Sequence, residues 1–215
     1  MYSIILIALL SYLIGSFPTS VVFGRMTRRI DIRDFGSKNA GGTNAFRVLG
    51  WQAGLIVAIV DVLKGMMAVL LVGKIRIDPL LLDFELIQIM AGSCAVIGHI
   101  WTVLAKFKGG KGVATAAGML IAIYPWAALV CFSIFVIVVL TTRYVSVGSM
   151  TAVSSLPVIL LIFNRFMGKH IISYSFIVFT LLISGLIFFT HRENIRRLIE
   201  GTENRFNKLS FKKKA

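Results

Sequence analysis

Acidic residues are scarce in this sequence: its 215 residues include nine aspartates and glutamates against 23 lysines and arginines, so the formal net charge is +14. Charged residues make up 15% of the chain and apolar residues 57%, and the mean hydropathy is +0.87. A soluble domain needs far more charged surface than this. The composition therefore predicts an all-α integral membrane protein in which residues 1–215 form a single domain.

Cysteine is also rare, and both copies, Cys94 and Cys131, lie inside apolar runs. Neither has the histidine or aspartate neighbours of a nucleophile or a metal site, so both are interpreted as packing residues. No two acidic residues share the spacing of an aspartate-rich metal motif, except Asp31 with Asp34 and Asp83 with Glu85. We expect no metal and no other cofactor.

The positive charge has no soluble fold to carry it, so nucleic acid is not an expected partner. The lysines at 208 and 212–214 favour attraction to anionic membrane lipids instead. We expect the protein to be monomeric.

Apolar runs near the roughly 20 residues that a membrane span requires occur at 2–24, 51–73, 84–105, 147–163 and 171–190. The first run lacks a basic leader segment and continues past Pro18, which favours a retained span over a cleaved signal peptide. A further uncharged run at 113–142 is too long for one ordinary pass and short for two. Pro125 provides a break in it, because proline removes a backbone donor and clashes with the preceding turn.

Lysine and arginine collect on the cytoplasmic side of membrane proteins, and their distribution here distinguishes two topologies. If the long run turns near Pro125, seven spans leave 18 basic residues inside and four outside, namely Lys74, Arg76, Arg165 and Lys169. If it crosses once, the split is eleven against eleven. We therefore predict seven transmembrane helices, with the N-terminus outside and the C-terminus cytoplasmic, in a bacterial inner membrane.

Three polar segments interrupt the apolar chain, at residues 37–47 (SKNAGGTNAFR), 106–115 (KFKGGKGVAT) and 191–205 (HRENIRRLIEGTENR). They are termed here the first, second and third islands. Each combines basic side chains with glycine, amide or hydroxyl groups, which is the chemistry that binds phosphate. The seven-span topology places all three at the cytoplasmic face, which predicts one shared site for a phosphorylated substrate.

In the first island, Gly41 and Gly42 allow the backbone to turn its N–H groups toward an anion. Side-chain donors are added by Ser37, Thr43, Asn44 and the planar guanidinium of Arg47. A glycine-rich surface loop with ordinary cytoplasmic charge is the alternative interpretation.

In the second island, Gly109 and Gly110 precede Lys111 and open onto an apolar run, so their amides are expected at a helix N-terminus, where the dipole favours an anion. This is not a Walker A loop, because Lys111 is followed by Gly112 and no strand precedes it. A tight re-entry turn with basic anchors is the alternative.

In the third island, helical spacing places His191 and Asn194 on one face, and Glu193 can pair with Arg197 one turn later. A solvated helix beside the membrane would give a similar pattern.

Two charged residues, Asp61 and Lys64, lie three apart within an apolar run, which indicates a helical ion pair facing the bundle. His99 could line a site together with Lys106 and Lys111. It could equally be a satisfied interior histidine.

Four segments taken in order resemble the bacterial acyl-phosphate:glycerol-3-phosphate acyltransferase family: GSFPTSVVFGR (15–25), DFGSKNAGGTNAFRVLG (34–50), GHIWTVLAKFKGGKGVAT (98–115) and the third island. The resemblance covers essentially the whole chain. It implies a seven-span inner-membrane enzyme that moves a fatty acyl group from acyl phosphate to glycerol 3-phosphate, giving lysophosphatidate and phosphate in the first acylation step of phospholipid synthesis. The family often has a proline near Trp101 and Thr102, which is absent here.

The resemblance also implies roles for individual residues. It assigns His191, Asn194 and Ser37 to catalysis, with His191 and Asn194 at the glycerol phosphate. Structural support is implied for Glu193, Asp61 and Lys64. The implied contacts to phosphate are Ser37, Gly41, Gly42, Thr43, Asn44, Arg47, Gly109, Gly110 and Lys111.

Such an acyl donor is already activated as a mixed anhydride, so the enzyme needs to align a hydroxyl, stabilise the developing oxyanion and hold two repelling phosphates. Other glycerolipid acyltransferases use a His-x-x-x-x-Asp pair, and here the position five residues after each histidine holds Leu104, Ser175 or Arg196. Whether His191 or a substrate phosphate takes the proton is left open by the spacing.

A membrane transporter or channel for a phosphorylated anion is the alternative from another class. Transporters usually bind substrate near the bilayer midplane, at broken helices in repeated halves. This chain has only Asp61 and Lys64 at that depth and shows no repeat.

Overall fold

The computed structural model describes residues 1–79, 82–166 and 172–206. Within these ranges the chain is all-helical, with no strand. The lysines predicted to bind lipid at 208 and 212–214, and part of the predicted outer loop at 164–170, lie outside the described residues.

Helices account for most of the described chain, and the α-helices are α1 (Tyr2–Gly15), α2 (Thr19–Arg28), α3 (Gly42–Leu49), α4 (Trp51–Leu70), α5 (Phe84–Ile100), α6 (Val113–Ile123), α7 (Pro125–Thr142), α8 (Val145–Phe166), α9 (Tyr174–Thr190) and α10 (Arg192–Ile199). Short 3-10 turns lie in three of the described connections, η1 (Ile32–Asp34), η2 (Val72–Lys74) and η3 (Val103–Ala105).

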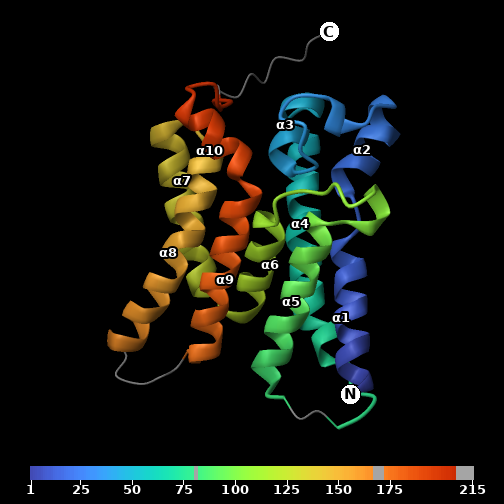
Figure 1. Ribbon diagram of the computed structural model, residues 1–215, viewed down its shortest axis with the longest axis vertical. Coiled ribbons are helices and arrows are strands. Elements are labelled where there is room, and N and C mark those ends of the chain that lie inside the picture. The colour runs from blue at the N-terminus through green and yellow to red at the C-terminus, as the bar shows by residue number, and fades with distance from the viewer. Residues whose placement is uncertain (80–81, 167–171, 207–215) are drawn as a thin grey trace.

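The helices form two groups with α6 between them (Figure 1). One group contains α1, α4 and α5, and the other contains α7, α8 and α9. The N-terminus lies at one end of the molecule, whereas α2, α3 and α10 lie at the opposite end. The two groups thus bring early and late parts of the sequence together at the α3 and α10 end.

Among the described residues, five helical segments are long and apolar enough to cross a membrane: Tyr2–Arg28, Trp51–Lys74, Phe84–Ala105, Pro125–Thr142 and Val145–Phe166. A sixth results if α9 and α10, which meet at a bend of 58°, are taken as one span. Helix α6 has 11 residues and rises only about 16 Å, roughly half the thickness of a hydrocarbon core. The protein is therefore a multi-pass membrane protein, with five or six candidate spans in the part of the chain that the structure describes, and the seven-span count stays a prediction.

The break predicted in the long apolar run is confirmed. Helix α6 ends at Ile123, and Pro125 is the first residue of α7. Proline suits this position because the first N–H of a helix has no intrahelical acceptor, and its fixed φ angle matches the helix. A 30-residue run therefore folds as two helices rather than one.

Proline also interrupts the first span, where α1 ends at Gly15 and Pro18 precedes α2. The interruption takes the carbonyl of Phe17 out of the regular helical hydrogen-bond pattern, and it accepts from the N–H of Thr19 at 3.0 Å and from Nζ of Lys64. A polar atom of α4 is thus tied to the break between α1 and α2.

Glycine allows α4 and α6 to pack with their backbones in contact. A Cβ on Gly65 would come well under 3.0 Å from the carbonyl of Thr115, and one on Gly118 would meet the carbonyl of Val62 in the same way. Small residues serve this purpose where membrane helices cross closely. The contact fixes the N-terminal end of α6 against α4, which matters for the site described next.

Candidate active site

A cavity of about 660 Å³ brings the three islands together. Residues of every island line its polar end: Ser37, Gly41, Gly42, Thr43, Asn44, Arg47, Lys111, His191 and Asn194. From this end the cavity continues along apolar side chains of α6, α7, α8 and α9, including Leu120, Phe132, Leu156 and Phe179. The space is therefore amphipathic, with a cationic end and a long apolar part.

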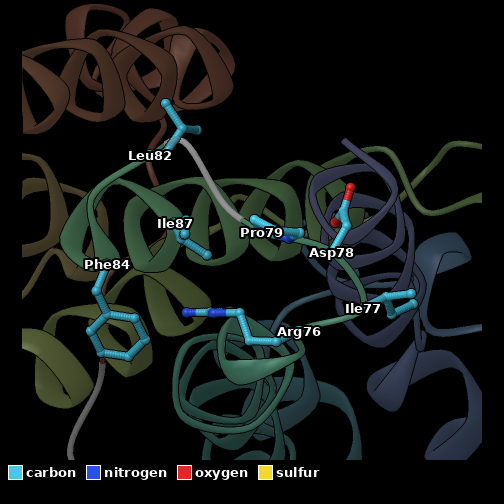
Figure 2. Close-up of a pocket in the computed structure, with 7 residues that line it drawn as sticks. All are labelled: Arg76, Ile77, Asp78, Pro79, Leu82, Phe84 and Ile87. Carbon is cyan, nitrogen blue, oxygen red and sulfur yellow. The ribbon is translucent and has the colours of Figure 1, made fainter.

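A second pocket, of about 560 Å³, lies at the opposite end of the molecule and contains none of the islands. Figure 2 shows its lining residues, Arg76, Ile77, Asp78, Pro79, Leu82, Phe84 and Ile87. Its polar groups are used locally, since Arg76 donates to the carbonyls of Gly73 and Ile75 and Asp78 binds the N-terminal amine. The amphipathic cavity is the better candidate for a functional site.

Two helix N-termini face the polar end of the cavity. Gly41 caps α3, and Gly41, Gly42 and Thr43 line the cavity. Gly112 caps α6 with a φ of +86°, a conformation that favours glycine, and it lines the cavity with Val113. The first N–H groups of a helix have no intrahelical acceptor, and the helix dipole is positive there. Two such ends make this a favourable place for phosphate.

Two cations add formal charge at the same place. Arg47, on α3, is half-buried, and its Nη2 donates to the carbonyl of Asn204 at 3.3 Å. Nζ of Lys111 donates to Oδ1 of Asn194, which joins the second island to the third. Burial, with smaller contributions from Arg47 and Arg197, lowers the pKa of Lys111 to about 8.

Asn44 shapes the first island from within. Its Oδ1 accepts the N–H of Ser37 at 2.8 Å, and its Nδ2 donates to the carbonyls of Ile32 at 3.0 Å and Phe35 at 3.1 Å. Both amide hydrogens are thus engaged by the protein. The structure leaves Asn44 no hydrogen for the predicted phosphate contact, and its contacts hold the loop that presents Ser37.

The N–H groups of Gly109 and Gly110 were expected to face an anion, but the structure places them elsewhere. Neither lines the cavity. Their N–H groups donate to the last carbonyls of α5, from Gly109 to Ile100 at 3.1 Å and from Gly110 to His99 at 3.0 Å. These glycines fasten the second island to α5, and Lys111 and Gly112 are the parts of the island that reach the cavity.

A carboxylate, Glu203, organises the third island. Its Oε1 accepts from Nδ2 of Asn194 at 2.6 Å and from the hydroxyl of Ser146 at 2.9 Å, and its Oε2 accepts from Nε of Arg197 at 2.7 Å. Burial alone would raise the pKa of Glu203, but these hydrogen bonds hold it below its usual value. Glu203 therefore stays ionised and fixes the orientation of the Asn194 amide.

Glu193, expected to give structural support by pairing with Arg197, is exposed. Arg197 pairs with Glu203 instead. Both acids lie within reach of Arg197 in sequence, and the fold of residues after α10 decides between them. Because acidic residues are scarce in this chain, an acid in the third island could have been suspected of a structural role. The sequence did not identify Asn194 as the partner of Glu203.

The tautomer of His191 follows from its hydrogen bond. Nδ1 lies 2.8 Å from the carbonyl oxygen of Ile187, and since a carbonyl only accepts, Nδ1 carries the hydrogen. Burial, together with the charge of Lys111, lowers the pKa of His191 to about 4. The imidazole is therefore neutral at pH 7 and has a free lone pair on Nε2.

The predicted ion pair in α4 is confirmed. Nζ of Lys64 lies 2.6 Å from Oδ1 of Asp61, and both side chains are buried. Thr19 donates to the same oxygen at 2.9 Å. Asp61 and His99 both line the cavity, so this buried cluster adjoins the polar end.

The chain matches a family of known activity. Residues 5–201 match the family model described as glycerol-3-phosphate acyltransferase. Among its relatives, the glycerol-3-phosphate acyltransferases of Chlorobium luteolum and Chlorobium phaeovibrioides are 45% and 46% identical to it, each over 100% of both chains.

Solved structures agree with the sequence relatives. PlsY (YgiH), an integral membrane glycerol 3-phosphate acyltransferase, in its glycerol 3-phosphate form, superposes with a TM-score of 0.82 at 36% identity over 96% of this chain and 97% of that chain. The lysophosphatidic acid form of PlsY gives a TM-score of 0.79 at 35% identity, with the same coverage. With the family model and full-length relatives in agreement, this chain belongs to the glycerol-3-phosphate acyltransferase family.

Proposed function

We propose that this protein transfers a fatty acyl group from acyl phosphate to a hydroxyl of glycerol 3-phosphate, giving 1-acylglycerol 3-phosphate and inorganic phosphate. This is the first acylation step of phospholipid synthesis. The observation that carries the proposal is the division of one cavity into a cationic end and a long apolar part. Both proposed substrates carry phosphate, and one carries a long apolar chain. The two ligands named for the PlsY structures combine the same chemistries.

The polar end is suited to holding two phosphates despite their mutual repulsion. Arg47 and Lys111 supply positive charge, and the N-termini of α3 and α6 supply N–H groups. Ser37 and Thr43 add hydroxyl donors beside them. Gly109 and Gly110 then act indirectly, because they place Lys111.

The apolar part is suited to the acyl chain. Its lining residues Leu129 and Phe132, both on α7, are 66% and 61% exposed, so this part of the cavity reaches the apolar outer surface of the helices. A chain can therefore reach it from the membrane. We propose that the protein acts as a monomer.

In the proposed reaction, the acceptor hydroxyl oxygen bonds to the acyl carbon while the bond from that carbon to the phosphate oxygen breaks. The hydroxyl proton leaves on the phosphate product. No acyl-enzyme is needed, because the mixed anhydride is already activated. Nε2 of His191 can accept a hydrogen bond from the hydroxyl and orient it. A pKa of about 4 makes His191 a weak base, and this favours the substrate phosphate, with a pKa of about 6, as the final proton acceptor.

Asn194 lies beside His191 and binds both Lys111 and Glu203. It can therefore hold the cation at the acceptor phosphate while the imidazole orients the hydroxyl. Ser37 is a donor for the leaving phosphate or the developing oxyanion.

We also propose seven passes through a bacterial inner membrane, with the active site at the cytoplasmic face. Arg192→Cys on α10 should then react with a membrane-impermeant maleimide only after cell lysis, whereas Ile77→Cys at the opposite end should react in intact cells. Both variants need a background without Cys94 and Cys131. Labelling of Arg192→Cys in intact cells would contradict this orientation.

Donor choice tests the proposed reaction. Purified protein given labelled glycerol 3-phosphate should form lysophosphatidate with acyl phosphate and not with acyl-CoA. One phosphate should be released per product molecule, and EDTA should leave the rate unchanged. Robust turnover with acyl-CoA, or loss of activity on chelation that magnesium restores, would show that the mechanism is wrong.

The rate should depend on the charge of Lys111. Because its pKa is lowered to about 8, the cation is present below that pH and lost above it, while the substrate phosphate stays dianionic. We expect kcat/KM for glycerol 3-phosphate to fall as pH rises through about 8, by up to tenfold per pH unit. Lys111→Arg should flatten this decline, and Lys108→Arg, at an exposed residue of the same island, should leave it in place. If kcat/KM of Lys111→Arg declined with pH in the same way as that of the wild-type protein, a group other than Lys111 would be responsible for the decline.

A further inference from the structure

The last turn of α5 forms the support of the second island. Its carbonyls at His99 and Ile100 accept the N–H groups of Gly110 and Gly109. The imidazole of His99 also lies directly against the loop, because a Cβ on Gly110 would come well under 3.0 Å from Nε2. Both the backbone and the ring of His99 therefore contact the island.

The other nitrogen of this ring faces the buried ion pair. Nδ1 of His99 lies 3.7 Å from Oδ1 of Asp61, which also accepts from Lys64 at 2.6 Å and from Thr19 at 2.9 Å. Lys64 donates in addition to the carbonyl of Phe17. The ring is thus enclosed between a cluster fixed by α2 and α4 on one side and Gly110 on the other.

We propose that His99 is a positioning residue, which transmits the fixed position of the Asp61 and Lys64 cluster to the second island and so places Lys111 for its phosphate ligand. Lys111 directly follows Gly110, and it reaches Asn194 across the cavity. A shift of Gly110 would displace the cation from Asn194 and from the N-terminus of α6. This inference rests on the proposed function, since the ligand is taken to be glycerol 3-phosphate.

The two glycines provide a matched pair for a test. A Cβ on Gly110 would meet the side chain of His99, whereas a Cβ on Gly109 would meet the carbonyl oxygens of His99 and Ile100. Neither glycine has a positive φ, so the backbone conformation itself does not oppose alanine at either position. Removing the imidazole can therefore relieve the steric clash of an alanine at position 110. It cannot relieve the clash of an alanine at position 109, which involves backbone oxygens.

The experiment measures kcat and KM for glycerol 3-phosphate in purified His99→Ala, Gly110→Ala, Gly109→Ala and the two double variants that contain His99→Ala. We expect His99→Ala to raise KM about tenfold and to change kcat less than about threefold, because a contact that positions a charged ligand group is lost. Gly110→Ala should raise KM at least as much. Its double variant should be no worse than His99→Ala, because the methyl group fits the vacated space. In the double variant with Gly109→Ala, the effects of the two substitutions on KM should be additive.

Two replacements separate positioning from filling of space. His99→Asn keeps a nitrogen beside Asp61, so its KM should lie between those of His99→Ala and the wild-type protein. His99→Leu only fills volume, so its KM should stay closer to that of His99→Ala. A wild-type KM in His99→Ala, additivity with Gly110→Ala, or better recovery by leucine would overturn the inference. Absence of turnover in the wild-type protein would instead overturn the proposed function. In that case the coupling between His99→Ala and each glycine substitution would be measured as the increase in Tm that glycerol 3-phosphate gives each variant. Gel filtration is the control for folding.

Discussion

Replacing Asn194 with alanine is expected to lower kcat by about 100-fold or more, the size usual for loss of a group that positions a reacting partner. The amide joins two islands, because its Oδ1 accepts from Lys111 and its Nδ2 donates to Glu203 at 2.6 Å. Without it, Lys111 loses its acceptor and a buried carboxylate loses a donor, which is costly. Steady-state kinetics with acyl phosphate and glycerol 3-phosphate measure the effect.

Two companion variants sharpen this prediction. Asn194→Asp should be at least as impaired as Asn194→Ala, because it places a second carboxylate against Glu203. Arg196→Ala, on the same helix, should keep kcat within about twofold of the wild-type value. Arg196 forms an exposed ion pair with Glu200, and exposed ion pairs contribute little to the stability of a fold. Near-normal kcat in a folded Asn194→Ala protein would remove Asn194 from the active site.

Arg47→Lys is expected to lower kcat/KM for glycerol 3-phosphate by roughly 30-fold, although the charge is kept. The planar guanidinium can bind phosphate through two N–H groups while another holds the carbonyl of Asn204, and an ammonium group cannot reproduce that geometry. A loss of about 2 kcal/mol, typical of a hydrogen bond to a charged group, corresponds to this factor. The effect should appear mainly in KM if both substrate and transition state are bound by Arg47.

The matched control is Arg28→Lys. Arg28 donates to the carbonyls of Val48 and Leu49 at the end of α3 and does not line the cavity. It tests the same chemical change at the same end of the molecule. Equal losses in the two variants would mean that Arg47 supports the fold and does not act on phosphate.

Features set by local chemistry could be predicted from the sequence. Proline disfavours a helix interior, so a break at Pro125 could be expected, although Pro157 is accommodated inside α8. Asp61 and Lys64 lie three residues apart in an apolar segment, so each could be expected to pair with the other. The convergence of the islands could be predicted for a similar reason, because positive charge marks one end of each span.

Features set by tertiary contacts could not be predicted. Asn44 looks like a free amide in the sequence, but its hydrogens are taken by Ile32 and Phe35, which only the folded loop brings close. The amides of Gly109 and Gly110 likewise turn to α5, where the helix end has unsatisfied carbonyls.

The same holds for Glu203. Helical spacing favours Glu193 as the partner of Arg197. The choice of Glu203 depends on how the chain folds back after α10.

A photoreactive acyl phosphate tests most directly whether one cavity holds both phosphate groups and the acyl chain. With a diazirine near the end of the chain, light should attach it to α7 and α9, at residues such as Leu129, Phe132 or Phe179, and glycerol 3-phosphate turnover or excess lysophosphatidate should suppress the labelling. Mass spectrometry of the peptides locates the attachment. Labelling confined to the opposite pocket around Arg76 and Phe84, or labelling that neither treatment reduces, would contradict the assignment of the active site.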